Sequence, residues 1–166
     1  MTKSTQPIPA GHEHLIPHLV FDSCSDAIEF YKKAFGAEEV SRVPAPDGKR
    51  MMHAEIRIGN SFLFMADDFP EYCGGNASSP TALKGTPVTI HRYVPDCDAA
   101  IRRAVDAGAT LLMPAADMFW GDRYGAITDP FGHKWSLATH IKDLTPEEVQ
   151  AGMEEAFAQG GDSAPE

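Results

Sequence analysis

Two side chains capable of acid/base chemistry lie two positions apart in the segment 51–58. Apolar and polar residues alternate there, which is typical of a half-buried strand and places His53 and Glu55 on one face. A histidine beside a carboxylate can move protons at neutral pH, so we predict these two residues as catalytic. An exposed face that pairs ions with Arg57 is the alternative interpretation. The opposite face then holds Met52, Ala54, Ile56 and Ile58.

A second set of side chains has the chemistry to surround a small molecule. Aromatic rings supply flat walls for a planar ligand, hydroxyl and imidazole groups supply hydrogen bonds, and arginine clamps anions. The predicted ligand-binding residues are His18, His91, Tyr93, Trp120, Tyr124, Arg50 and Ser136. Trp135 and Arg123 have the same chemistry. Core packing or surface exposure explains such residues equally well.

A weak internal repeat indicates which elements position these residues. Residues 18–28 and 91–101 align without a gap, and His, Cys and Ile recur at matching places. Each copy runs into a helix-like segment that ends at Gly36 or Gly108. Two copies of one supersecondary unit can close a shared core and a shared cavity.

Each copy has the order strand, helix and then two or three strands. In the first copy, Ser23 begins a helix. Leu15 belongs to the strand before it, on the apolar face that we expect to pack on the helix. The predicted elements are strand 14–21, hairpin 51–58 and 61–66, strand 88–94, helix 99–107, strand 110–113 and hairpin 123–139. Thr145 then caps a last helix, which has an apolar stripe of Val149, Met153, Ala156 and Phe157.

These elements divide the chain into six parts. Segments rich in Pro, Gly, Ser and Asn without periodicity predict loops and tails. The parts are a disordered tail 1–13, a first module 14–68, a linker 69–87, a second module 88–140, a C-terminal helix 141–159 and a disordered tail 160–166.

Composition excludes several classes of partner. The formal net charge of −10 opposes binding to a nucleic-acid backbone, which relies on clustered Lys and Arg. No apolar run approaches the ~20 residues of a membrane span, so no membrane partner is expected. The three cysteines lack Cys-x-x-Cys spacing, which favours a reducing cytoplasm over a disulfide framework. Cys24 and Cys97 begin helices, and we interpret both as structural.

Four strings of residues resemble the vicinal oxygen chelate (VOC) superfamily, in its glyoxalase/bleomycin-resistance-like, PhnB-like branch. They are 27–36 (AIEFYKKAFG), 52–59 (MHAEIRIG), 120–125 (WGDRYG) and 129–137 (DPFGHKWSL). The resemblance spans residues 14–140. It implies an α+β fold with two βαβββ modules that form a pair of cupped half-barrels, to which this chain adds a C-terminal helix. It also implies a ligand in the cup and a homodimer.

The metal ligands that the resemblance implies carry over badly. Their positions fall on residues that do not hold a divalent ion: Ile16, Thr89, Ser136 and either Leu63 or Phe64. His18 and His91 each follow an expected ligand by two positions and therefore share its strand face. With His53 and Glu55 they offer a relocated set of ligands for Zn, Ni, Fe or Mn as the alternative.

The prediction that combines these observations is a glyoxalase-like, cytoplasmic homodimer that binds a small organic molecule in its cup. It needs no cofactor, and it acts by sequestration or by weak acid/base chemistry. The alternative is a metal-dependent lyase, isomerase or dioxygenase that uses the relocated ligands. The residues leave open whether turnover occurs at all.

Overall fold

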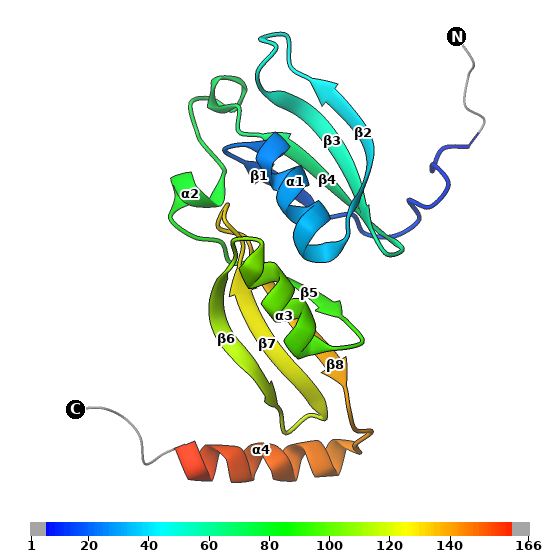
Figure 1. Cartoon of the computed structure of the whole chain (residues 1–166), viewed down its shortest axis with the longest axis vertical. Coiled ribbons are helices and arrows are strands. Elements are labelled where there is room, and N and C mark those ends of the chain that lie inside the picture. The colour runs from blue at the N-terminus through cyan, green and yellow to red at the C-terminus, as the bar shows by residue number, and fades with distance from the viewer. Residues whose placement is uncertain (1–5, 161–166) are drawn as a thin grey trace. The chain divides into compact units, whose positions relative to one another are not determined.

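The two copies of the repeat form two compact units in the computed structural model, which describes residues 6–160. Contacts divide the chain into Met1–Thr86 and Pro87–Glu166. Each unit has one four-stranded mixed sheet and the predicted βαβββ order (Figure 1). The α+β class of two βαβββ modules with a C-terminal helix is therefore confirmed.

The sheet of the first unit is covered on one face by a helix. Its elements are β1 (His18–Phe21), α1 (Cys24–Phe35), β2 (Glu38–Pro44), β3 (Met51–Ile58) and β4 (Ser61–Asp67). The strand order is β1-β4-β3-β2, in which β1 and β4 are parallel and the other pairs antiparallel. Figure 1 shows α1 lying along this sheet. The buried residues of α1 and of the strands form the core of this unit.

Helix α1 buries the face that its sequence predicts. Apolar residues recur three and four positions apart, as one helix face requires: Ala27, Phe30, Tyr31 and Ala34 are all buried. Gly36 ends the helix at φ 67°, a left-handed conformation that favours glycine. Ser23 is the N-cap residue, but its side chain makes no capping bond to the backbone, and its hydroxyl donates to the Asp26 carboxylate at 2.7 Å. The Cys24 N–H donates instead to the buried Asp67 carboxylate.

The second unit repeats this arrangement. Its elements are β5 (Thr89–Tyr93), α3 (Cys97–Asp106), β6 (Thr110–Asp117), β7 (Asp122–Thr128) and β8 (Lys134–His140). The strand order is β5-β8-β7-β6, with β5 and β8 parallel. Asp96 caps α3, because its carboxylate accepts the Ala99 N–H at 2.9 Å. The core between α3 and the sheet contains Ile101, Ile127, Trp135 and Leu137.

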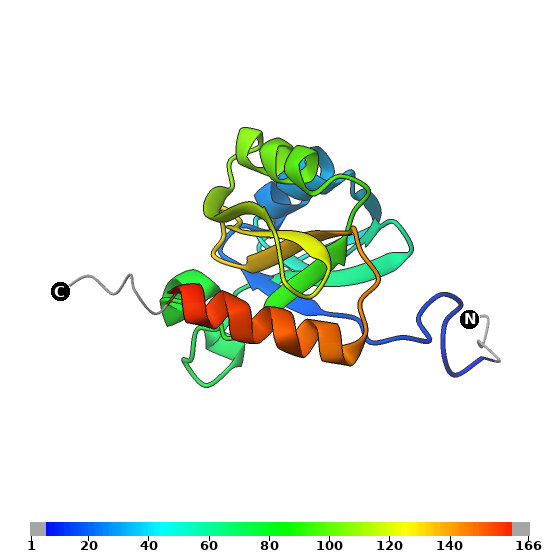
Figure 2. The same ribbon diagram turned by 90° about the horizontal axis from the view of Figure 1, so that it is seen from below.

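The last helix, α4 (Pro146–Gly160), lies at the turn that joins β6 to β7 (Figures 1 and 2). The predicted cap is confirmed: Glu148 N–H donates to Thr145 Oγ1 at 3.3 Å, and the Glu148 carboxylate accepts the Thr145 N–H at 2.8 Å. Gly152 packs closely on Phe119. The apolar stripe is only partly covered, because Val149 and Met153 are half-buried but Phe157 is 73% exposed.

Two side chains lie elsewhere than the alternation predicts. The pairing of β2 with β3 shifts register next to Met52, so Met51 is buried at 5% exposure and Met52 is 39% exposed. Leu15 is 99% exposed, because β1 begins only at His18, after Pro17, and not at residue 14. Neither Met52 nor Leu15 therefore belongs to the core.

The segment predicted as a linker, 69–87, is tied to the first unit. It contains a 3-10 helix, η1 (Pro70–Tyr72), and the short α2 (Pro80–Leu83). The Asp68 carboxylate accepts the N–H groups of Ser78 and Ser79 at 2.8 Å, and the Ser79 hydroxyl donates to Asp22 at 2.6 Å. These bonds hold the segment beside β4 and α1.

The predicted tails fall partly outside the described residues. Positions 1–5 and 161–166 lie beyond them, whereas residue 160 ends α4. Residues 6–13 are described, and in this part His12 contacts Glu55 and Phe62 of the first unit's sheet. None of the helices between residues 6 and 160 has the length and apolar character that crossing a membrane requires.

Candidate functional site

The face of the second sheet that is turned away from α3 gathers aromatic and polar side chains. Alternation along β5, β7 and β8 places them there, opposite the core residues Ile127 and Leu137. We call this surface the aromatic face and define it by His91, Tyr93, Trp120, Asp122, Tyr124, Ser136 and His140. Five of the seven ligand-binding residues predicted from the sequence are among them.

His91 lies at the centre of this face. It is the register partner of Ser136 in the parallel pair β5 and β8, and its Nδ1 is 2.8 Å from the buried Ser136 hydroxyl oxygen. The Tyr93 ring meets the His91 ring edge-on at a centroid distance of 4.8 Å, and the Tyr124 ring is stacked with it at 6.1 Å. Trp120 meets Tyr124 edge-on at 5.7 Å. Four rings therefore form one connected surface.

Asp122 supplies the charge of the aromatic face. Its side chain is buried, and its carboxylate accepts from Tyr93 Oη at 2.9 Å and from His140 Nδ1 at 2.8 Å. Burial alone raises the pKa of Asp122, but the hydrogen bonds from His140 and Tyr93 outweigh this effect and hold the pKa below its ordinary value. The carboxylate is therefore ionised and acts as an acceptor, not as an acid.

His140 links Asp122 to the surface. Its Nε2 is 2.9 Å from a carboxylate oxygen of Asp143, so carboxylates face both ring nitrogens. The hydrogen bonds to Asp143 and Asp122 raise the pKa of His140. Sequence reasoning missed both Asp122 and His140. The signal was present, because strand alternation places both on the face of a predicted site residue. Asp122 is two positions from Tyr124, and His140 is four positions from Ser136.

The equivalent face of the first sheet carries the predicted catalytic residues, but it pairs them differently. His53, His18 and Phe64 form a ring cluster: His18 is edge-on to His53 at 6.1 Å, and His53 is edge-on to Phe64 at 4.9 Å. Desolvation and the neighbouring His53 lower the pKa of His18. Glu55 does not bond to His53. Its carboxylate is 2.7 Å from Nε2 of His12, a residue that sequence reasoning missed because no periodicity marks it.

The two candidate arginines are engaged by carboxylates of their own units. Arg50 pairs with Asp47 at 2.7 Å and with Glu71 at 2.6 Å, and its guanidinium lies 4.3 Å from the centroid of the Phe69 ring. Arg123 binds Asp98 and, at 2.8 Å, Asp117. An anionic ligand at either arginine has to displace a carboxylate. Arg50 lies in the first unit and is not part of the aromatic face.

The donor set does not fit the metal site that the resemblance implies. The strand register decides between Leu63 and Phe64 for the fourth ligand position. His18 pairs with Phe64 as His91 pairs with Ser136, so Phe64 is the equivalent of Ser136. Ile16 and Phe64 have no donor atom, and the hydroxyls of Thr89 and Ser136 are poor ligands for a divalent ion. Within the described part of the chain, no three His, Cys, Asp or Glu side chains gather as ligands.

Burial makes the two helix-start cysteines unreactive. Desolvation raises the pKa of Cys24 to about 12 and also raises the pKa of Cys97, whose thiol donates to the Leu137 carbonyl at 3.1 Å. Their structural role is as predicted.

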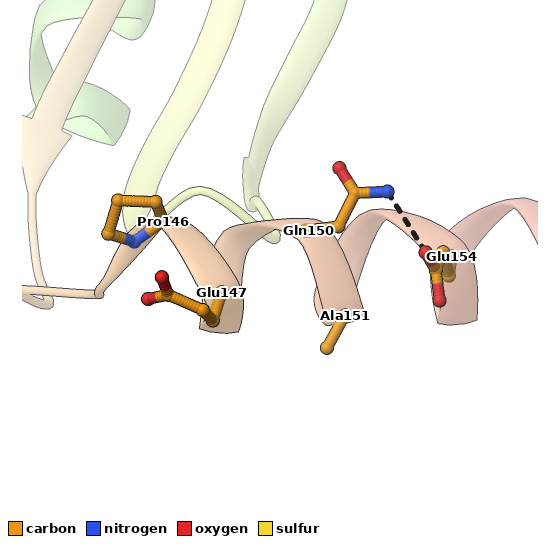
Figure 3. A pocket seen from close by; sticks show the side chains of 5 residues that line it. All are labelled: Pro146, Glu147, Gln150, Ala151 and Glu154. Atoms are coloured by element: carbon orange, nitrogen blue, oxygen red, sulfur yellow. Dashed lines mark hydrogen bonds between the residues drawn. The ribbon is translucent and has the colours of Figure 1, made fainter.

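A shallow hollow lies on α4 (Figure 3). It has a volume of about 410 Å³. Gln150 donates to Glu154 along it at 2.9 Å. Its lining residues are Pro146, Glu147, Gln150, Ala151 and Glu154. These side chains offer two carboxylates and no nucleophile, so we place no chemistry there.

Comparison with known proteins agrees with the geometry. The glyoxalase/bleomycin resistance protein/dioxygenase superfamily matches residues 12–137. The uncharacterized protein Rv0887c of Mycobacterium tuberculosis is 51% identical over 139 residues, which cover 84% of this chain and 81% of that protein. The crystal structure of the Arabidopsis thaliana gene product At5g48480 is 30% identical, with a TM-score of 0.60 over 75% of this chain and 97% of that chain.

A PhnB protein from Bacillus cereus shares the fold alone. Its structure has a TM-score of 0.56 at 15% identity and covers 76% of this chain and 99% of that chain. The family match covers most of the chain, and the two βαβββ units agree with it. The chain belongs to the glyoxalase/bleomycin resistance protein/dioxygenase superfamily.

Proposed function

We propose that this chain binds a small planar organic molecule on the aromatic face, without a metal ion. The observation that carries the proposal is the connected surface of Tyr93, His91, Tyr124 and Trp120 rings beside the acceptor Asp122. Flat rings with a few fixed polar groups are the usual composition of a small-molecule site. Tyr93 is 60% exposed, which leaves its ring available to a ligand.

Sequestration is the mode of action that the charges favour. Asp122 is held ionised by His140 and Tyr93, so it anchors a donor group of the ligand and does not transfer a proton. Weak acid/base chemistry by His53 and Glu55 requires His12 to leave the Glu55 carboxylate first. The proposal therefore treats turnover as secondary to binding.

Trp120 is a built-in reporter for this binding. The chain has two tryptophans, and Trp135 is 2% exposed in the core, so a change of emission on ligand addition comes from Trp120. Titration with a panel of quinoline-, naphthol- and indole-type fragments should quench the emission saturably. The Trp120→Phe variant should lose this response while its unfolding transition stays unchanged.

A pair of tyrosine variants then locates the site. Tyr124→Ala removes a ring from the aromatic face and should weaken binding about two- to tenfold, the worth of one aromatic contact. Tyr72→Ala removes a ring that is 71% exposed in the first unit and should leave the affinity unchanged. Equal losses in the two variants, or no quenching by any fragment, contradict the proposal.

We propose that the protein is cytoplasmic and forms a homodimer. The unpaired cysteines support a reducing compartment, and the exposed Phe157 on α4 supports an interface between two copies. Removal of residues 144–166 followed by light scattering tests whether α4 forms the interface. A monomer is expected, and an unchanged dimer counts against α4.

A further inference from the structure

His12 occupies a small site on the open face of the first sheet. Its ring lies parallel to the Phe62 ring, with a centroid distance of 4.5 Å and an interplanar angle of 12°, and its Nε2 is 2.7 Å from the Glu55 carboxylate. Phe64 closes one side at a centroid distance of 6.0 Å. The side chains of His12 and Glu55 are only 17% and 13% exposed. The flat His12 ring is thus held by stacking on Phe62 and by the Glu55 carboxylate at its edge.

The hydrogen bonds of His12 identify the charge of the occupant. Nδ1 is 3.1 Å from the Ala10 carbonyl oxygen, and Nε2 faces the Glu55 carboxylate. Both partners only accept, so both ring nitrogens must carry hydrogen and the ring is an imidazolium. The hydrogen bonds to Ala10 and Glu55 raise the pKa of His12, in agreement with this geometry.

His12 belongs to the segment before β1, residues 6–17, which we call the arm. The backbone of the arm also lies close to the sheet. Gly11 has φ +82°, and a Cβ at this residue would come within 3.1 Å of the Phe62 ring. The left-handed conformation of Gly11 and its close approach to the Phe62 ring both favour glycine at this position. Ring stacking and the Glu55 bond link the arm to the sheet, and the Phe64 N–H of β4 donates to the Pro17 carbonyl at 2.9 Å where the arm ends.

From this geometry we propose that Glu55 and Phe62 form a binding subsite for a flat nitrogen cation, such as an amidinium, guanidinium or protonated heterocycle, which His12 occupies as an internal ligand. The first unit builds this subsite alone, so it goes beyond the function proposed for the aromatic face. A ligand with such a group displaces His12 and the arm. The net charge of −10 favours the approach of a cation.

The probe is benzamidinium, a flat cation, and the neutral benzamide of the same shape is its control. Dissociation constants come from NMR titration of the full chain. His12→Ala should bind benzamidinium about tenfold or more tightly than the wild type, because the competing charge-assisted bond is gone. His14→Ala, an equivalent change two positions along the arm, should match the wild type. Adding Glu55→Gln to His12→Ala should abolish the gain.

The pH dependence gives a second readout. Glu55 on β3 and Glu13 on the arm are the charged groups that face His12, and β4 presents Phe62 and Phe64. Since the pKa of His12 is raised, the seated arm is stabilised at low pH and released as pH rises through that pKa. Wild-type affinity for benzamidinium should therefore increase between pH 6 and about 8.5, and His12→Ala should show no such trend.

Three results overturn the proposal: equal affinity of wild type and His12→Ala, equal binding of benzamide and benzamidinium by His12→Ala, or retention of the gain after Glu55→Gln. Circular dichroism of each variant verifies that it is folded. Trp120 quenching by the fragment panel is measured on the same samples. Absence of quenching in the wild type refutes the proposed function, whereas quenching in the wild type together with no effect of His12→Ala on benzamidinium binding refutes the subsite alone.

Discussion

Gly121 fixes the position of the aromatic face, and its substitution tests how tightly that face is built. The residue lies between Trp120 and Asp122, and its carbonyl accepts the N–H groups of Ile141 and Lys142 at 3.0 Å. Its φ is +94°, and a Cβ added to it would overlap the Lys142 carbonyl oxygen, a backbone atom that cannot turn aside. In Gly121→Ala, the left-handed conformation should cost about 1–2 kcal/mol and the overlap about 1–3 kcal/mol.

The matched control is Gly59→Ala in the β3–β4 turn. Gly59 has φ +60° and nothing within 4 Å of an added Cβ, so this variant carries the conformational cost without the overlap. Urea denaturation should show Gly121→Ala destabilised by about 2–5 kcal/mol in total and Gly59→Ala by about 1–2 kcal/mol. Fragment quenching of Trp120 should weaken only in Gly121→Ala. Equal destabilisation in both variants refutes the close packing of Gly121 against the Lys142 backbone.

Two further predictions follow from titratable groups. His140 lies between Asp122 and Asp143 and has a raised pKa, so its contribution to stability is complete below pH 6.5 and is lost as pH rises through that raised value. The stability difference between wild type and His140→Gln should shrink from pH 6 to about 8.5, and a difference independent of pH counts against the pairing. Cys73 is exposed and should react with iodoacetamide in the folded protein, while Cys24, with a pKa of about 12, should react only after unfolding. Mass spectrometry of the adducts checks this, and early modification of Cys24 contradicts its burial.

The fold was largely predictable because local signals agreed with the repeat. The cap at Thr145, the stop at Gly36 and the turn after Ile58 lie where their residue types require them. Errors arose where a single residue changed the register. The bulge at Met52 moved Met51 into the core, and Pro17 delayed β1. The sequence does not mark this bulge, because Met51 and Met52 are both methionines and either could continue the apolar face.

The site was predictable in its residue types but not in its pairings. Strand alternation brought His91, Tyr93 and Tyr124 to one face, as expected. The partner of Glu55 was not predictable, because His12 is 43 positions away on an arm without secondary structure. A hydrogen bond across such a separation depends on tertiary structure, and no spacing rule in the sequence reports it.

The central claim is metal-free binding of an organic molecule at the aromatic face. Native mass spectrometry of the chain, purified without chelator and then mixed with the fragment that quenches Trp120 best, tests it most directly. The expected spectrum shows one fragment bound per chain and no first-row metal. Stoichiometric Zn, Ni, Fe or Mn that is lost together in His18→Ala and His53→Ala contradicts the account, and so does a chain that binds no fragment.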